Sequence, residues 1–225
     1  MKKYIFAILV ACFTSNLFSQ IHEIGFFLGG TNFMGDIGNT SYINPNKIGG
    51  GFVYKYNLNP RIALRGTISY LPISGDDTHS NNPYRKIRGY NFTNKIYELA
   101  AGVEFNFFEY NIRERNTSFT PYILTEIAVF DSKKADFING NNNIVFKNNF
   151  SYAIPVGIGI KGRLADNLAY AFESAVRFTF EDTLDYTTNK IDRLNFGGTG
   201  SDYYVFTGFS LVYTFGRPPC YADRE

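Results

Sequence analysis

One short polar stretch of the sequence holds the residue types that hydrolytic catalysis needs: Ser74, Asp76, Asp77, His79 and Ser80. A serine hydroxyl that is activated by a histidine, itself oriented by a carboxylate, is a common nucleophile in acyl transfer. A precise site, however, is best held on rigid element ends rather than in a crowded polar loop. We therefore predict no catalytic residue, and we interpret His79 as an exposed loop histidine.

The sequence gives even less support for a metal-binding or cofactor-binding site. His22, the other histidine, has no partner at metal-site spacing, and the sequence has no Cys/His cluster, phosphate-cradling glycine loop or dinucleotide fingerprint. The chain has 22 basic and 20 acidic residues, and without Lys2 and Lys3 of the leader (22 − 2 = 20) the two signs balance. This balance provides no basic excess for nucleic acid. We predict neither a metal nor a cofactor.

The first nineteen residues have the pattern of a secretory signal peptide. Lys2 and Lys3 precede an apolar run from Tyr4 to Phe13, and Ser19–Gln20 offers a small-residue cleavage point. The apolar run is too short to cross a bilayer as a helix. A lipoprotein-type box at Leu9–Cys12 is the alternative, but it would leave an unusually short signal. We expect a signal peptide at 1–19, a barrel at 20–216 and a tail at 217–225.

The elements that would position any site are short alternating stretches, joined by connections that are long and short in turn. Each stretch is long enough to cross a bilayer as a tilted strand, which takes about 9–11 residues. We predict eight strands: His22 to Phe33, Ile48 to Leu58, Ile62 to Pro72, Lys95 to Phe107, Thr120 to Phe130, Phe150 to Lys161, Leu168 to Thr179 and Tyr204 to Phe215.

One face of each stretch is apolar and aromatic, and the other is small or charged. In the fourth stretch Tyr97, Leu99 and Val103 alternate with Glu98 and Glu104, and successive strand residues point to opposite sides. A soluble sandwich or a lipocalin could show this pattern with the apolar face inside. Glycine and alanine on the polar face instead favour a narrow lumen. The sequence therefore predicts an all-β fold, an eight-stranded antiparallel transmembrane β-barrel in the Gram-negative outer membrane, surrounded by its lipids.

The lengths of the connections predict the orientation of the barrel. Short turns of such barrels face the periplasm, and an even strand number places both termini there. The long outer connections are rich in Asn, Gly, Ser and Asp, which favours solvated, mobile loops.

Eight strands enclose a lumen that is only just wide enough for side chains, so a pore is not expected. Charges at that depth are costly unless they are paired, and Arg65 with Glu104 is a reasonable pair on neighbouring strands. Pro155, which also faces inward, predicts a bulge. The predicted lumen network contains Lys55, Arg65, Glu98, Glu104, Glu126, Glu173 and Arg177.

Four segments resemble a known family: Gly29 to Gly38, ELAAGVEFNFFEY at Glu98 to Tyr110, FTPYIL at Phe119 to Leu124, and the ending FGRPPCY at Phe215 to Tyr221. Together they are similar to PorG-like proteins, the outer-membrane barrel component of the type IX secretion system in gliding and pathogenic Bacteroidetes. The most specific part is the E-L-x-x-x-x-E-F-N-F-F-x-Y strand with the T-P-Y that opens the next strand.

The resemblance implies a non-enzymatic role in protein transport. PorG-like proteins associate with the periplasmic ring formed by a lipoprotein and its partner, and they support export. The long inner turn from Phe108 to Phe119, with Arg113, Glu114 and Arg115, is the expected contact with that ring, together with the tail around Cys220. A small lipid-modifying enzyme and a surface barrel with adhesive loops remain alternatives.

Overall fold

A computed structural model describes residues 21–110, 119–139, 143–165, 167–196 and 200–216. Eight antiparallel strands form one closed barrel in the order β1 to β8, because β1 pairs with β8 from His22↔Phe215 to Met34↔Tyr203. This closure confirms the predicted fold class. The strands are β1 (Ile21–Met34), β2 (Lys47–Asn57), β3 (Ile62–Asp76), β4 (Asn91–Asn106), β5 (Phe119–Ile138), β6 (Ile144–Ala165), β7 (Leu168–Thr179) and β8 (Tyr203–Phe215).

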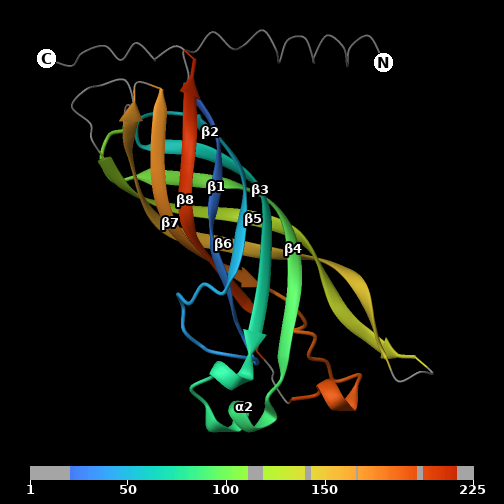
Figure 1. The fold of residues 1–225 in the computed structure, drawn as a ribbon. Helices are drawn as coiled ribbons and strands as arrows, with labels where there is room; N and C mark the ends of the chain where they lie inside the picture. Colours follow the sequence, from blue (N-terminus) through green and yellow to red (C-terminus); the bar gives the residue numbers. More distant parts are fainter. Residues whose placement is uncertain (1–20, 111–118, 140–142, 166, 197–199, 217–225) are drawn as a thin grey trace, which may run out of the picture.

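The two ends of the barrel differ, as Figure 1 shows. At the turn end, β1 begins, β8 ends, and connections such as that between Asn57 and Ile62 are short. At the loop end lie helix α2 (Pro83–Arg88), the 3-10 turns Asp77–His79 and Asp192–Leu194, and a long hairpin. None of the described helices is long and apolar enough to cross a membrane.

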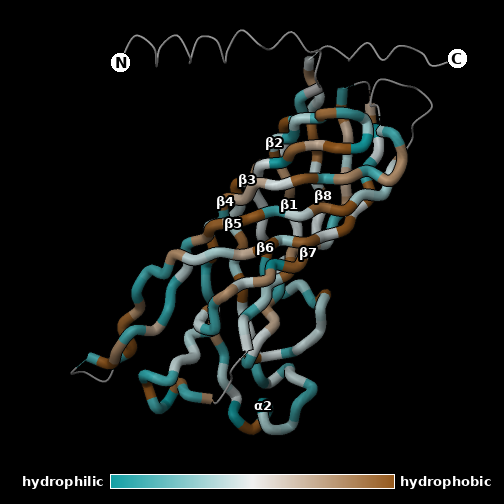
Figure 2. The backbone as a smooth tube through the Cα atoms, turned by 180° about the vertical axis from the view of Figure 1, so that it is seen from behind, coloured by the Kyte–Doolittle hydropathy of each residue, from teal (hydrophilic) through white to brown (hydrophobic). Residues whose placement is uncertain are grey.

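The apolar face of each strand points outward. Phe26, Leu99 and Ile127 on the outer wall are 55%, 56% and 73% exposed, whereas the residues that alternate with them are buried. Figure 2 shows hydrophobic segments recurring along the barrel strands, while the loop end is mostly hydrophilic. Burying this apolar wall in acyl chains removes it from water, which favours membrane residence.

The predicted outer connection between Asp131 and Asn149 is wrong in its extent. β5 and β6 remain paired far beyond the barrel wall, from Asp131↔Phe150 to Ile138↔Ile144, and form the hairpin that projects from the loop end. The sequence prediction ended these strands where the outward residues become polar. The backbone ladder continues there because it does not depend on an apolar outer face.

Pro155 does not produce the predicted bulge. Its partner on β7 is Arg177 in regular register, and the pairing of β5 with β6 keeps the same register on both sides of it. The missing N–H removes a ladder donor without inserting a residue. The irregularity of the β5–β6 pairing lies instead between Ala135 and Phe137.

Much of the described outer connections is exposed to solvent, as predicted, but other residues of these connections pack into a lid over the loop end. We use "loop-end lid" for the described residues 35–46, 77–90, 180–196 and 200–202 of these connections. Ile37 and Leu184 of this lid are fully buried, in one hydrophobic cluster with Phe33, Phe92 and other aromatic residues of the strand ends. The apolar residues of the lid are isolated in sequence, which is why composition suggested polar loops.

Candidate functional site

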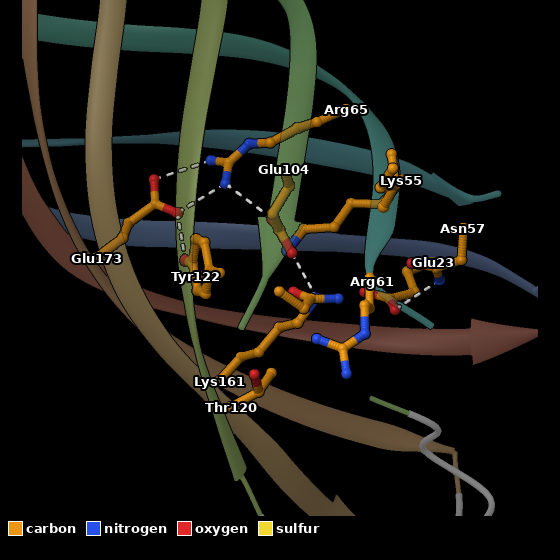
Figure 3. Close-up of polar contacts among 12 residues, drawn as sticks. Glu23, Lys55, Asn57, Arg61, Arg65, Glu104, Thr120, Tyr122, Lys161 and Glu173 are labelled. Atoms are coloured by element: carbon orange, nitrogen blue, oxygen red, sulfur yellow. Dashed lines mark hydrogen bonds and ion pairs between the residues drawn. The ribbon is translucent and has the colours of Figure 1, made fainter. Parts of the chain in front are cut away.

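The lumen is filled by a charged network centred on Glu104 (Figure 3). Its Oε2 lies 2.6 Å from Lys55 Nζ and 3.5 Å from Arg65 Nη1, and its Oε1 accepts a hydrogen bond from Lys161 Nζ. Glu104, Lys55 and Lys161 are all buried. One carboxylate therefore contacts three cations, which come from β2, β3 and β6.

Arg65 extends the network across the lumen to β7. Its two Nη atoms each donate to one oxygen of Glu173 at 2.8 Å, and Tyr122 Oη donates to Glu173 Oε2 at 2.8 Å. Arg65 Nε lies 3.3 Å from Glu126. Bidentate guanidinium–carboxylate pairs are directional and strong, so this pair fixes opposite walls of the barrel relative to each other.

A third contact group lies nearer the loop end. Arg177 Nη2 is 3.5 Å from Glu98 Oε1, and Tyr204 Oη donates to Glu98 Oε2 at 2.6 Å. The structure thus brings all seven predicted network residues into the lumen, including the Arg65–Glu104 pair at 3.5 Å.

Sequence reasoning missed two charged members of this interior. Lys161 lies on the polar face at the end of a predicted strand, and Glu23 accepts a bond from Asn57 at 2.8 Å near the turn end. Alternation would have found both residues, since each is charged and shares a face with small or polar residues.

Both ends of the lumen are blocked by side chains. Toward the loop end, buried aromatic residues pack across the lumen, with Phe27 edge-on to Phe206 at 5.2 Å and Phe130 edge-on to Tyr204 at 6.0 Å. At the turn end, buried Tyr110 lies with its ring 4.6 Å from Lys161 Nζ. The described interior is therefore filled by buried, ion-paired side chains, which leaves little room for a water-filled conduit.

Asp77 holds the loop-end lid together. Its buried carboxylate accepts bonds from Arg88 at 2.6 and 2.9 Å, from the Gly38 amide at 2.8 Å and from the Tyr90 amide at 3.2 Å. One side chain therefore joins two outer connections. Asp77, a residue type that catalysis could use, is thus a structural hub of the lid.

The other catalytic candidates do not form a nucleophile–base pair. His79 Nδ1 lies 3.3 Å from Asp76 Oδ2 and 3.1 Å from Thr78 Oγ1, and its side chain is 81% exposed. Among the described residues no serine hydroxyl bonds to His79. In the same part of the chain no group of three or more His, Cys, Asp or Glu residues could hold a metal ion.

Buried carboxylates also gather in the lid. Burial, with the negative charges of Asp185, Asp182 and Asp36, raises the pKa of Asp202 from its ordinary 3.8 to about 9, although the Leu184 amide bonds to it. Burial likewise raises the pKa of Asp185 to about 6. Asp202 is therefore neutral at neutral pH.

We predict that the lid loosens as the pH rises. A folded-state pKa of about 9 against 3.8 when exposed means that stability is full below about pH 4 and falls until about pH 9. Amide hydrogen exchange of residues 181–196, corrected for intrinsic rates, should show weaker protection at about pH 8 than at about pH 5. Asp202→Asn should remove most of this dependence, and an unchanged slope would contradict the assignment.

The expected partner contacts lie mainly outside the described residues: Arg113, Glu114, Arg115 and Cys220. The stem that leads into the long turn is described, however. Phe107 N donates to Pro121 O at 3.0 Å, and Tyr110 N donates to Pro60 O at 3.1 Å. The turn therefore starts from a stem that is bonded to the start of β5 and to the β2–β3 connection.

The closed ring, the outward apolar wall and the filled lumen together define an outer-membrane β-barrel fold. The chain belongs to the family described as "Domain of unknown function (DUF6089)", whose model matches residues 2–224. No curated protein matches the chain.

Among solved structures, the chain is similar to other outer-membrane barrels. Ail of Yersinia pestis has 13% identity and a TM-score of 0.49, covering 88% of this chain and 99% of that one. The N-terminal β-barrel domain of Pseudomonas aeruginosa OprF has 10% identity and a TM-score of 0.47, covering 88% and 98%. Neisserial surface protein A has 10% identity and a TM-score of 0.42, covering 87% and 96%.

Proposed function

We propose that this chain is a PorG-like, non-enzymatic component of the type IX protein secretion machinery. In this role it lies in the outer membrane and contacts the periplasmic ring lipoprotein complex through its turn end and tail. The observation that supports the proposal most is where the family-like residues fall. The segments Glu98–Tyr110 and Phe119–Leu124 build the stem of the long turn and contribute Glu98, Glu104 and Tyr122 to the charged plug.

The stem residues of the E-F-N-F-F-x-Y segment are bonded to the β2–β3 connection and to the start of β5. Asn106 donates from its backbone N to Arg61 O at 2.7 Å and from its side-chain Nδ2 to Pro60 O at 3.0 Å. Thr120 of the T-P-Y segment accepts from Phe108 N at 3.0 Å. These bonds fix the described stem in place, so a partner that binds there loses less ordering entropy than with a free loop.

The filled lumen also favours an accessory role. An interior blocked by Glu104 and its three cations leaves no described passage for a polypeptide. A barrel of this kind can serve as an anchor for other components in the membrane. Cargo would then cross elsewhere in the machinery.

The test is co-purification from native membranes. Reversing the charge of Arg113 and Arg115 (Arg113→Glu with Arg115→Glu) should lower recovery of the ring lipoprotein about tenfold or more, since a close interfacial charge pair couples by about 1.5 kcal/mol upward. Barrel insertion, read from the membrane fraction, should be unchanged.

The matched control reverses two charges at the other end of the molecule, Lys86→Glu with Lys190→Glu. It changes the net charge equally and should leave recovery intact. Equal recovery from both variants would remove the turn from the interface. Deleting the gene should abolish type IX export, and normal export after deletion would overturn the proposed function itself.

A further inference from the structure

The outer wall carries a polar cleft where β4 and β5 separate near the loop end. Their pairing ends at Tyr97↔Asp131. Beyond that point the side chain of Asn94, in place of its backbone, bonds to β5. It donates from Nδ2 to Lys133 O at 2.7 Å and accepts from Lys133 N at 3.2 Å. The two strands are thus held apart by a side chain, and an opening forms between them.

The opening has a volume of about 380 Å³ and is lined by Lys95, Lys133, Asn148, Tyr186 and their neighbours. Lys95 and Lys133 are exposed, with Lys133 directly opposite Asn148 in the hairpin. Tyr186 closes one side, since its hydroxyl donates to Thr93 O at 2.9 Å and its ring lies 4.6 Å from Phe146. Pockets of this volume lie in the usual range for small-molecule groups, about 300–1,000 Å³.

The position of the cleft along the barrel axis indicates which layer of the membrane lies beside it. Tyr97 and Tyr70 are paired outward-facing aromatic residues, with ring centroids 5.2 Å apart. Tyr97 lines the cleft on the side nearer the turn end. Aromatic girdles of outer-membrane barrels sit at the membrane interface. Lys95 is the next lipid-facing residue of β4 after Tyr97 toward the loop end. Its ammonium therefore lies at the level of the lipid headgroups.

The charge of the cleft favours an anion. Neither Lys95 nor Lys133 has an ion-pair partner among the described residues. The one carboxylate of the lining, Asp131, is 3.4 Å from the amide nitrogen of Asn148. Lys134 and Lys147 stand opposite each other on the same hairpin and add to the positive potential.

We infer that this cleft binds a phosphate group of the lipopolysaccharide in the outer leaflet. Lys95 and Lys133 supply two positive charges against the single negative charge of Asp131, and the Asn148 amide is a neutral donor. Lysines near a membrane surface contribute about 1 kcal/mol each to attraction of anionic lipid. The inference rests on the outer-membrane fold and is independent of the secretion role.

The experiment titrates the purified chain in detergent micelles with bisphosphorylated lipid A, followed by native mass spectrometry. The double variant Lys95→Gln with Lys133→Gln should bind about 30-fold more weakly, which corresponds to two lysines at the strength above. The control Lys86→Gln with Lys190→Gln removes the same charge elsewhere on the loop end and should bind like the original chain. Thermal melts followed by circular dichroism verify that both variants are folded.

Two further arms identify the ligand. Dephosphorylated lipid A should bind the original chain as weakly as the double variant binds the intact lipid. Inorganic phosphate at equal concentration should not displace the lipid, and full displacement would overturn the assignment to a lipid headgroup. Equal weakening by both lysine pairs would show general charge attraction and would overturn the site.

Discussion

Glu104→Leu should destabilise the barrel by about 3–5 kcal/mol, the range for removing one partner of a buried ion pair. The substitution leaves Lys55, Lys161 and Arg65 near one another in the lumen without the carboxylate that now lies among them. Their mutual repulsion adds to the cost of burying each cation. Urea unfolding in detergent micelles, followed by circular dichroism, measures the loss.

The matched control is a glutamate whose pair is exposed. Glu109 lies 3.3 Å from Arg61, and both side chains are largely in solvent; Glu109→Leu should change stability by at most about 1 kcal/mol. Combining Glu104→Leu with Lys161→Met should cost less than the sum of the two single changes, because the pair is coupled. Additive costs, or a Glu104 effect as small as that of Glu109, would contradict the role assigned to this network.

Most of the barrel can be predicted from the sequence, because a lipid-facing side and a lumen-facing side impose a period of two on every strand. β7 was predicted with the bounds that the structure shows, Leu168–Thr179. The errors concentrate at β5 and β6, beyond the membrane. There the outward positions hold residues such as Asp131, Lys133 and Asn148, so alternation of apolar residues no longer reports the strand.

The sequence predicts which residues face the lumen, but it does not predict which of them contact one another. Arg65 was matched with Glu104 on the neighbouring strand, and this contact forms at 3.5 Å. The shorter bidentate contact is with Glu173 on β7, across the barrel. Partners across a lumen depend on strand stagger and closure, which a linear pattern does not contain. The loop-end lid was missed for the same reason, because Ile37 and Leu184 become neighbours only after closure.

Gly159→Val should lower stability by about 3 kcal/mol or more, because the lumen has no space for an added side chain there. A Cβ at this position would lie 2.5 Å from Cζ and 2.6 Å from Oη of Tyr122, and 2.7 Å from the backbone oxygen of Phe172. Overpacking costs about 1–3 kcal/mol. Displacing the phenol also breaks its 2.8 Å bond to Glu173, and a bond to a charged group contributes about 1.5–3 kcal/mol.

Gly66 provides the control for this substitution, since it lies in a strand but points to the outer wall. A Cβ there would have its nearest neighbour, the backbone oxygen of Ala100, at 3.9 Å, so Gly66→Val should be tolerated in the same urea unfolding measurement. Adding Tyr122→Ala to Gly159→Val should recover part of the loss that clash causes. A lumen with spare room, as in a conducting pore, predicts instead that both glycine variants unfold at the same urea concentration, and that result would refute the sealed interior on which the anchoring role depends.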